Sequence, residues 1–127
     1  MPYAYVVEDH RDTANCLSQW LRLFNYEVRI ALGPLAAIEA LSGRVPDVIF
    51  LDIHMHGMDG VELIERIRAL DHRKDVPIVM VTGTVDCAVV GAALAAGADD
   101  VLYKPTDVAI VVATVTKCVE RRRHQDT

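Results

Sequence analysis

The sequence predicts an α/β domain in which a five-stranded parallel sheet is covered by five helices on its two faces. Short apolar runs alternate along the chain with longer segments whose apolar residues recur at helical spacing. Regular alternation of strand and helix favours parallel strands joined by crossover helices. A chain of 127 residues can bury a substantial core, so we expect residues 1–127 to form one domain with a basic end from about residue 120.

Five segments have the character of β-strands. Most of them are apolar runs bounded by polar or turn residues, as is typical of strands buried on both faces of a parallel sheet. The second segment instead alternates polar and apolar side chains. We expect strands over residues 3–7, 26–31, 48–51, 76–81 and 100–103.

Five further segments have helical spacing. We expect helices from residue 12 to a stop at Asn25, from residue 35 to Gly43, and over residues 60–70, 86–96 and 107–123. Asp59 and Glu62 form a variant of the capping box at the start of the third helix, and Gly97 caps the fourth. The last segment is rich in valine, which suits a strand as well as a helix, but its length and the alternation favour a helix.

Composition and charge narrow the possible partners. A net charge of −5 argues against nucleic acid, because contacts with phosphates need a basic face. No apolar stretch approaches the ~20 residues that span a bilayer, and the first residues lack the pattern of a signal peptide. We therefore expect a cytoplasmic protein that binds neither nucleic acid nor membrane.

The three cysteines give no sign of a disulfide framework or a zinc site. Cys16, Cys87 and Cys118 are widely spaced, and the sequence contains no CxxC pair. We expect all three to pack as small apolar residues.

Polar side chains follow four of the five expected strands at their carboxyl ends. They are Glu8 and Asp9 after the first strand, Asp52 after the third, Thr82 after the fourth and Lys104 after the fifth. In a parallel sheet these ends lie along one edge, where ligands bind in a crevice. The topology therefore predicts three carboxylates, a hydroxyl and an ammonium around a single site.

This set of side chains predicts phosphoryl transfer onto Asp52. Three close carboxylates repel one another unless a cation shares the site, and oxygen ligands suit Mg²⁺. An aspartate can attack phosphorus, while a metal ion and a lysine offset the developing charge. The simpler alternative, that Asp52 only caps a loop, is weakened by the presence of Thr82 and Lys104.

With these residues in place, the chain resembles the response-regulator receiver domains of two-component signalling over nearly its whole length. The matching pieces are Val6-Val7-Glu8-Asp9, Asp52 with Met55 and Met58-Asp59-Gly60, Val81-Thr82-Gly83, Ala96-Gly97-Ala98-Asp99-Asp100, and Lys104-Pro105. No piece is specific alone, but five in this order are. The resemblance is to receivers of the chemotaxis-type single-domain kind, and it implies the flavodoxin-like strand order 2-1-3-4-5.

The resemblance also implies a role for each matching residue. Asp52 would be the phosphoacceptor, and Mg²⁺ or Mn²⁺ would be held by Asp52, Asp9, the backbone carbonyl of His54 and, through water, Glu8. Thr82 would be the switch hydroxyl, Gly83 would leave the phosphoryl group accessible, Lys104 would bind phosphate, and a cis peptide would join Lys104 to Pro105. The implied partners are a sensor histidine kinase or histidine phosphotransfer protein and a downstream protein target. No turnover of an external small molecule is expected.

Three positions depart from the family pattern. His56 replaces the usual proline after Met55, and Glu8 replaces the commoner aspartate. Val101 stands where an aromatic ring usually moves with the switch hydroxyl, although Tyr103 shares its strand face and lies on the expected output face. The change at Val101 leaves open a pseudo-receiver that binds partners without phosphorylation.

The same residues also allow other interpretations. A Mg²⁺-dependent phosphatase with a phospho-aspartate intermediate is less favoured, because His54 occupies the place of its second acid. The pair His54 and His56 lacks a third soft ligand nearby in the sequence, and His10 is expected to be a loop residue. Asp99 and Asp100 are expected to solvate the turn before the fifth strand.

Overall fold

The computed structural model describes residues 2–53, 59–70, 76–83, 87–103 and 108–125, and it confirms the predicted fold class. One sheet of five parallel strands has the order β2-β1-β3-β4-β5. The strands are β1 (Tyr3–Val7), β2 (Glu27–Ala31), β3 (Val48–Asp52), β4 (Ile78–Thr82) and β5 (Asp100–Tyr103). The helices are α1 (Arg11–Leu23), α2 (Pro34–Ala40), α3 (Gly60–Ala69), α4 (Cys87–Ala96) and α5 (Val108–Gln125).

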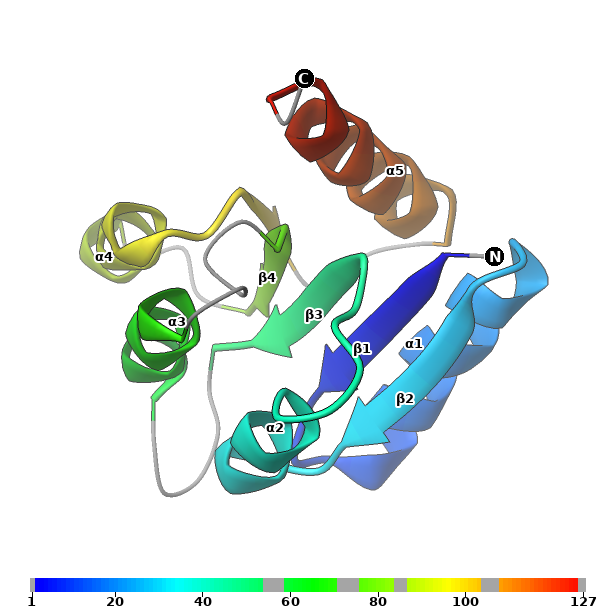
Figure 1. Ribbon diagram of the computed structural model, residues 1–127, viewed down its shortest axis with the longest axis horizontal. Coiled ribbons are helices and arrows are strands. Elements are labelled where there is room, and N and C mark those ends of the chain that lie inside the picture. The colour runs from blue at the N-terminus through cyan, green and yellow to red at the C-terminus, as the bar shows by residue number, and fades with distance from the viewer. Residues whose placement is uncertain (1, 54–58, 71–75, 84–86, 104–107, 126–127) are drawn as a thin grey trace.

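Helices cover both faces of the sheet, so the core has two layers (Figure 1). Tyr5 and Val7 of β1 belong to the layer under α2, α3 and α4, whereas Ala4 and Val6 belong to the layer under α1 and α5. This division follows from the alternation of side chains along a strand. Burying a large apolar side chain such as Leu21, which is fully enclosed, stabilises the fold by about 1.5–3 kcal/mol.

The ends of three helices follow from their sequences. The Asp59 carboxylate accepts a hydrogen bond from the Glu62 backbone N–H at 2.8 Å, which satisfies one of the free donors at the start of α3. Asn25 at φ +67° and Gly97 at φ +123° turn the chain after α1 and α4. These predicted helix ends are confirmed.

The start of β4 differs from the prediction for a chemical reason. Val76 and Pro77 are buried but precede the strand, which begins at Ile78. Proline has no N–H to donate to a neighbouring strand. Its carbonyl oxygen still accepts from the Ile49 N–H at 2.8 Å, so pairing with β3 begins through the acceptor alone.

Two of the three cysteines are exposed, so the prediction that all three pack inside is wrong for Cys16 and Cys87. Only Cys118 is buried, and burial raises the pKa of its thiol to about 11. Small residues on a surface helix can face either way, which is why composition alone misplaced the other two.

The valine-rich last segment is a helix, as its length predicted. Val111 is buried in the layer under α1 and α5, as is Cys118 about two turns further along the same face of the helix. Among the described residues, none of the helices has both the length and the apolarity needed to cross a bilayer.

Candidate functional site at the carboxyl edge of the sheet

Strand register brings the first and third strands' terminal acids together. Val7 of β1 pairs with Leu51 of β3, so the next residues, Glu8 and Asp52, are neighbours at the carboxyl edge. Both side chains are buried, with 1% of Glu8 and 5% of Asp52 exposed. The Glu8 N–H donates to the Ala31 carbonyl of β2 at 3.1 Å, which holds Glu8 in line with the sheet.

His10 completes a cluster with these two acids. One ligand atom each of Glu8, His10 and Asp52 lies within 4.8 Å of the others. His10 Nδ1 is 3.1 Å from Glu8 Oε1 and 3.3 Å from Asp9 Oδ1, and the His10 backbone N–H donates to Glu8 Oε1 at 3.2 Å. Asp9 therefore joins the cluster through the His10 ring.

Sequence reasoning treated His10 as an ordinary loop residue and missed its place beside the acids. Its ring is mostly exposed, as expected of a loop, yet Nδ1 faces both carboxylates. The available signal was its position directly after Glu8 and Asp9 and before α1. The His10 carbonyl also accepts from the Ala14 N–H at 3.0 Å, so the helix start fixes the backbone of this residue.

The burial of Glu8 and its closeness to Asp52 make the ionised form of Glu8 less favourable. Burial raises the pKa of Glu8 above its usual 4.5, and the hydrogen bond with Asp52 and the Asp52 charge raise it further. Hydrogen bonds from His10 act in the opposite direction. The pKa of the exposed His10 ring is raised by its bond to Glu8 and by the charges of Asp9 and Glu8.

The donor set fits a hard divalent cation. Carboxylate oxygens are the ligands that Mg²⁺ and Mn²⁺ prefer, and Glu8 and Asp52 present them side by side. Burial, the hydrogen bond with Asp52 and the Asp52 charge all raise the pKa of Glu8, and a bound cation would offset that charge. The residues that would hold it are Asp52 and the acids after β1.

Thr82 is fully buried at the end of β4, adjacent to Val81, which pairs with Asp52 across the sheet. The following residue, Gly83, is exposed, and a Cβ placed there would meet no described atom within 4 Å. A buried hydroxyl thus stands next to open space at the same edge as Asp52.

Val101 and Tyr103 lie on β5 as predicted. Val101 packs partly buried against the layer under α3 and α4, whereas Tyr103 is 48% exposed and pairs in register with Thr82. The predicted metal ligand His54, the neighbouring His56, and the pair Lys104 and Pro105 lie outside the described residues.

Asp99 is not a solvating residue, which corrects the sequence-based expectation for the turn before β5. Its Oδ2 accepts from the Ile78 N–H at 2.7 Å and lies 3.0 Å from Arg68 Nη2. With 13% of its side chain exposed, it is a structural ion-pair partner at the opposite edge of the sheet. Asp100 has a local role, since its Oδ1 accepts from the Val101 N–H at 2.8 Å.

A five-stranded sheet of this order with acids at its carboxyl edge belongs to the flavodoxin-like α/β class. Residues 4–116 match the response regulator receiver domain family, so the chain belongs to that family of two-component signal-transduction modules.

The sequence relatives include proteins named as transcriptional regulators. The chain is 38% identical over 121 residues to the transcriptional regulatory protein PrrA of Mycobacterium tuberculosis, covering 95% of this chain and 51% of PrrA. It is 32% identical over 122 residues to the C4-dicarboxylate transport transcriptional regulatory protein DctD of Rhizobium meliloti, covering 96% of this chain and 26% of DctD. The chain thus spans about half of PrrA and about a quarter of DctD.

Solved structures share the fold. A CheY-like response regulator receiver domain protein from Methanospirillum hungatei superimposes with a TM-score of 0.92 at 23% identity, covering 98% of both chains. A two-component response regulator from Clostridium difficile gives a TM-score of 0.88 at 26% identity, covering 95% of this chain and 98% of the other. The predicted strand order is confirmed.

Proposed function

We propose that this receiver accepts a phosphoryl group on Asp52 from a phosphohistidine, and that the modification changes its binding to another protein. The observation that carries the proposal is the buried pairing of Asp52 with Glu8 at the carboxyl edge of a receiver fold. The phosphodonor would be a sensor histidine kinase or a histidine phosphotransfer protein. Residues 1–127 would form one receiver domain in the cytoplasm.

The side chains support each part of this transfer. An Asp52 oxygen would bond to phosphorus as the phosphorus–nitrogen bond of the donor histidine breaks. Asp9, Asp52 and the predicted His54 carbonyl, with Glu8 through water, would hold Mg²⁺ or Mn²⁺, which neutralises charge on carboxylate and phosphoryl oxygens when bound. Thr82 and Lys104 would bind phosphoryl oxygens, and open space at Gly83 would admit the group.

The partners follow from charge and family. We propose a protein rather than nucleic acid as the direct partner of this domain, because its net charge is −5. PrrA and DctD are transcriptional regulators by name, and the matching part is only a fraction of each. The face that contains Val101 and Tyr103 is the proposed output surface. No turnover of external phosphoesters is expected.

Mass spectrometry after incubation with acetyl phosphate and Mg²⁺ tests the proposal. The protein should gain the mass of one phosphoryl group, and Asp52→Asn should gain none. Asp47→Asn is the matched control, because Asp47 lies at the opposite edge, where it accepts from the Tyr3 N–H, and it should keep the gain.

Two outcomes would contradict the proposal. An unmodified wild-type protein would favour the pseudo-receiver, for which the packed Val101 in place of a mobile ring is the supporting observation. Continuous release of phosphate from small phosphoesters would favour the phosphatase.

A further inference from the structure

Helix α4 has an apolar surface that the described part of the chain leaves exposed. Its ten residues, CAVVGAALAA, include no charged side chain. A helix that is apolar all round is normally buried, yet in α4 only Ala93 is fully buried, and Ala88, Ala92 and Ala95 are exposed. Exposed apolar surface of this kind marks a site of interaction.

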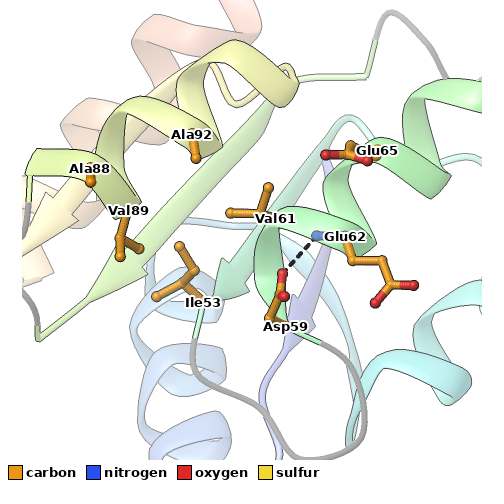
Figure 2. A pocket seen from close by; sticks show the side chains of 8 residues that line it. All are labelled: Ile53, Asp59, Val61, Glu62, Glu65, Ala88, Val89 and Ala92. Atoms are coloured by element: carbon orange, nitrogen blue, oxygen red, sulfur yellow. Dashed lines mark hydrogen bonds between the residues drawn. The ribbon is translucent and has the colours of Figure 1, made fainter.

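A groove runs between this helix and α3. One cavity of about 460 Å³ lies at the amino-terminal ends of both helices, with Ile53, Val61, Val89 and Ala92 among its lining residues. Figure 2 shows Ile53 and Val61 between the small side chains of α4 and the acidic side chains of α3.

The groove continues toward the carboxyl ends of the two helices. A second cavity of about 620 Å³ shares Val61, Glu65 and Ala92 with the first and reaches Ala69 and Ala96. Along α3 the lining extends from Asp59 to Ala69, about 15 Å or three helical turns. This elongated shape suits a helix better than a compact small molecule.

The α3 side of the groove is acidic. Asp59 is used as the helix cap, and Glu62 Oε1 lies 3.2 Å from Arg66 Nη2. Glu65 is exposed and forms no ion pair with any residue that the structure describes. Arg68, at the far end, is already held by Asp99. A partner with a positive charge beside its apolar face would therefore complement Glu65.

We propose that the α3–α4 groove binds an amphipathic helix of a partner protein. The small apolar face of the partner would lie on Val61, Ala92 and their neighbours, and its lysine or arginine residues would face Glu65. Alanines on α4 permit close approach, and helix-in-groove recognition uses this combination of an apolar face and flanking charges. The inference does not depend on phosphorylation of Asp52.

Nuclear magnetic resonance with the whole unphosphorylated chain tests this inference. The probe is a synthetic helical peptide of about five turns, with alanine and leucine on one face and flanking lysines. Amide shifts should change in α3, in α4 and at Ile53. The same peptide with glutamate in place of every lysine should not bind.

Variants locate the binding to the groove. Ala92→Glu, which places a charge on the groove floor, and Glu65→Lys should each weaken binding by about tenfold. Gly91→Glu is the control on the same helix, since Gly91 is exposed, lines neither cavity and has no described atom within 4 Å of a Cβ. Glu39→Lys on α2 is the control for net charge. Both controls should bind within about twofold of wild type.

Several results would overturn the inference. They are absence of binding at millimolar peptide, shifts centred on another face, equal binding of the glutamate peptide, or equal weakening by groove and control variants. Octylammonium is the small-molecule probe: the same shifts at a lower concentration than the lysine peptide would assign the groove to a small amphipathic cation instead. Should Ala92→Glu fail to fold, the exposed Glu65→Lys decides the result.

Discussion

The two edges of the sheet differ in how their polar groups are paired. At the amino edge, opposite charges and donor–acceptor pairs match within the chain, as where the Tyr3 N–H donates to Asp47 Oδ2 at 2.7 Å. At the carboxyl edge, the buried acids Glu8 and Asp52 lie side by side, and burial, the hydrogen bond with Asp52 and the Asp52 charge all raise the pKa of Glu8. The first arrangement stabilises the fold, whereas the second keeps charge available for a ligand.

The amino edge is held by long-range side-chain bonds. The Tyr5 hydroxyl lies 2.8 Å from the Ala40 carbonyl oxygen and so joins β1 to the end of α2. Arg68, at the end of α3, donates from Nε and Nη2 to the Gly97 carbonyl at 3.1 and 2.7 Å and pairs with Asp99. These bonds connect elements that are far apart in sequence, so breaking them should lower stability without touching the acids.

The largest effect is expected for Arg68→Ala. Arg68 and Asp99 are only 14% and 13% exposed, so loss of the arginine leaves Asp99 and the Gly97 carbonyl without a major partner. The free energy of unfolding should fall by about 3 kcal/mol in urea titrations. Arg66→Ala is the control, because its exposed pair with Glu62 is worth less than about 0.5 kcal/mol. An equal loss of unfolding free energy in Arg68→Ala and Arg66→Ala would contradict the stabilising role of the amino edge.

A smaller effect is expected for Gly97→Ala. At φ +123° a side chain is strained, and a Cβ would lie 2.8 Å from Arg68 Nε, so the arginine must shift. We expect a loss of about 2 kcal/mol. The cost should shrink in the Arg68→Ala background, because the two changes disrupt one contact.

Replacing Gly91 by alanine should instead increase the free energy of unfolding. Gly91 lies inside α4 with open space around it among the described residues, so alanine should stabilise the helix by up to about 1 kcal/mol. Thermal unfolding of the two alanine variants measures the contrast directly, and a shift of both melting temperatures in the same direction would contradict it.

The smallest effect, and the one specific to the carboxyl edge, is expected for Glu8→Gln. Because burial and Asp52 raise the pKa of Glu8 above 4.5, its stabilising contribution is present below pH 4.5 and is lost as pH rises through the raised value. Without divalent cations, the free energy of unfolding of the wild type, relative to that of Glu8→Gln, should therefore decrease as pH rises from 4.5 through the raised pKa of Glu8.

Urea titrations at a series of pH values measure this decline. Added Mg²⁺ should restore the stability of the wild type at neutral pH more than that of the variant, because a ligand stabilises the state that binds it. If the difference in free energy of unfolding between the wild type and Glu8→Gln stayed constant with pH, it would contradict a raised pKa at Glu8.

The sequence was sufficient for the fold and for the neighbourhood of Glu8 and Asp52. Apolar runs fixed the strands, and the common direction of parallel strands placed their carboxyl ends together. The pairing of Val7 with Leu51 then brings the two acids into contact. The roles of His54 and Lys104 remain predictions.

Other features had little or no signal in the sequence. His10 is an exposed residue whose importance lies in the direction of one ring nitrogen. Arg68 and Asp99 are 31 positions apart, and neither interrupts a periodic pattern, so their ion pair could not be inferred. The groove beside α4 depends on which side of an all-apolar helix is covered, and spacing cannot decide that.

The alternation of side chains along neighbouring strands has a further consequence. Phe50 belongs to the α1–α5 layer and Met80 to the layer under α3 and α4, so counting two residues on assigns Asp52 and Thr82 to opposite sides of the sheet. A small group that touched both side chains would bridge the two helical layers at their common boundary.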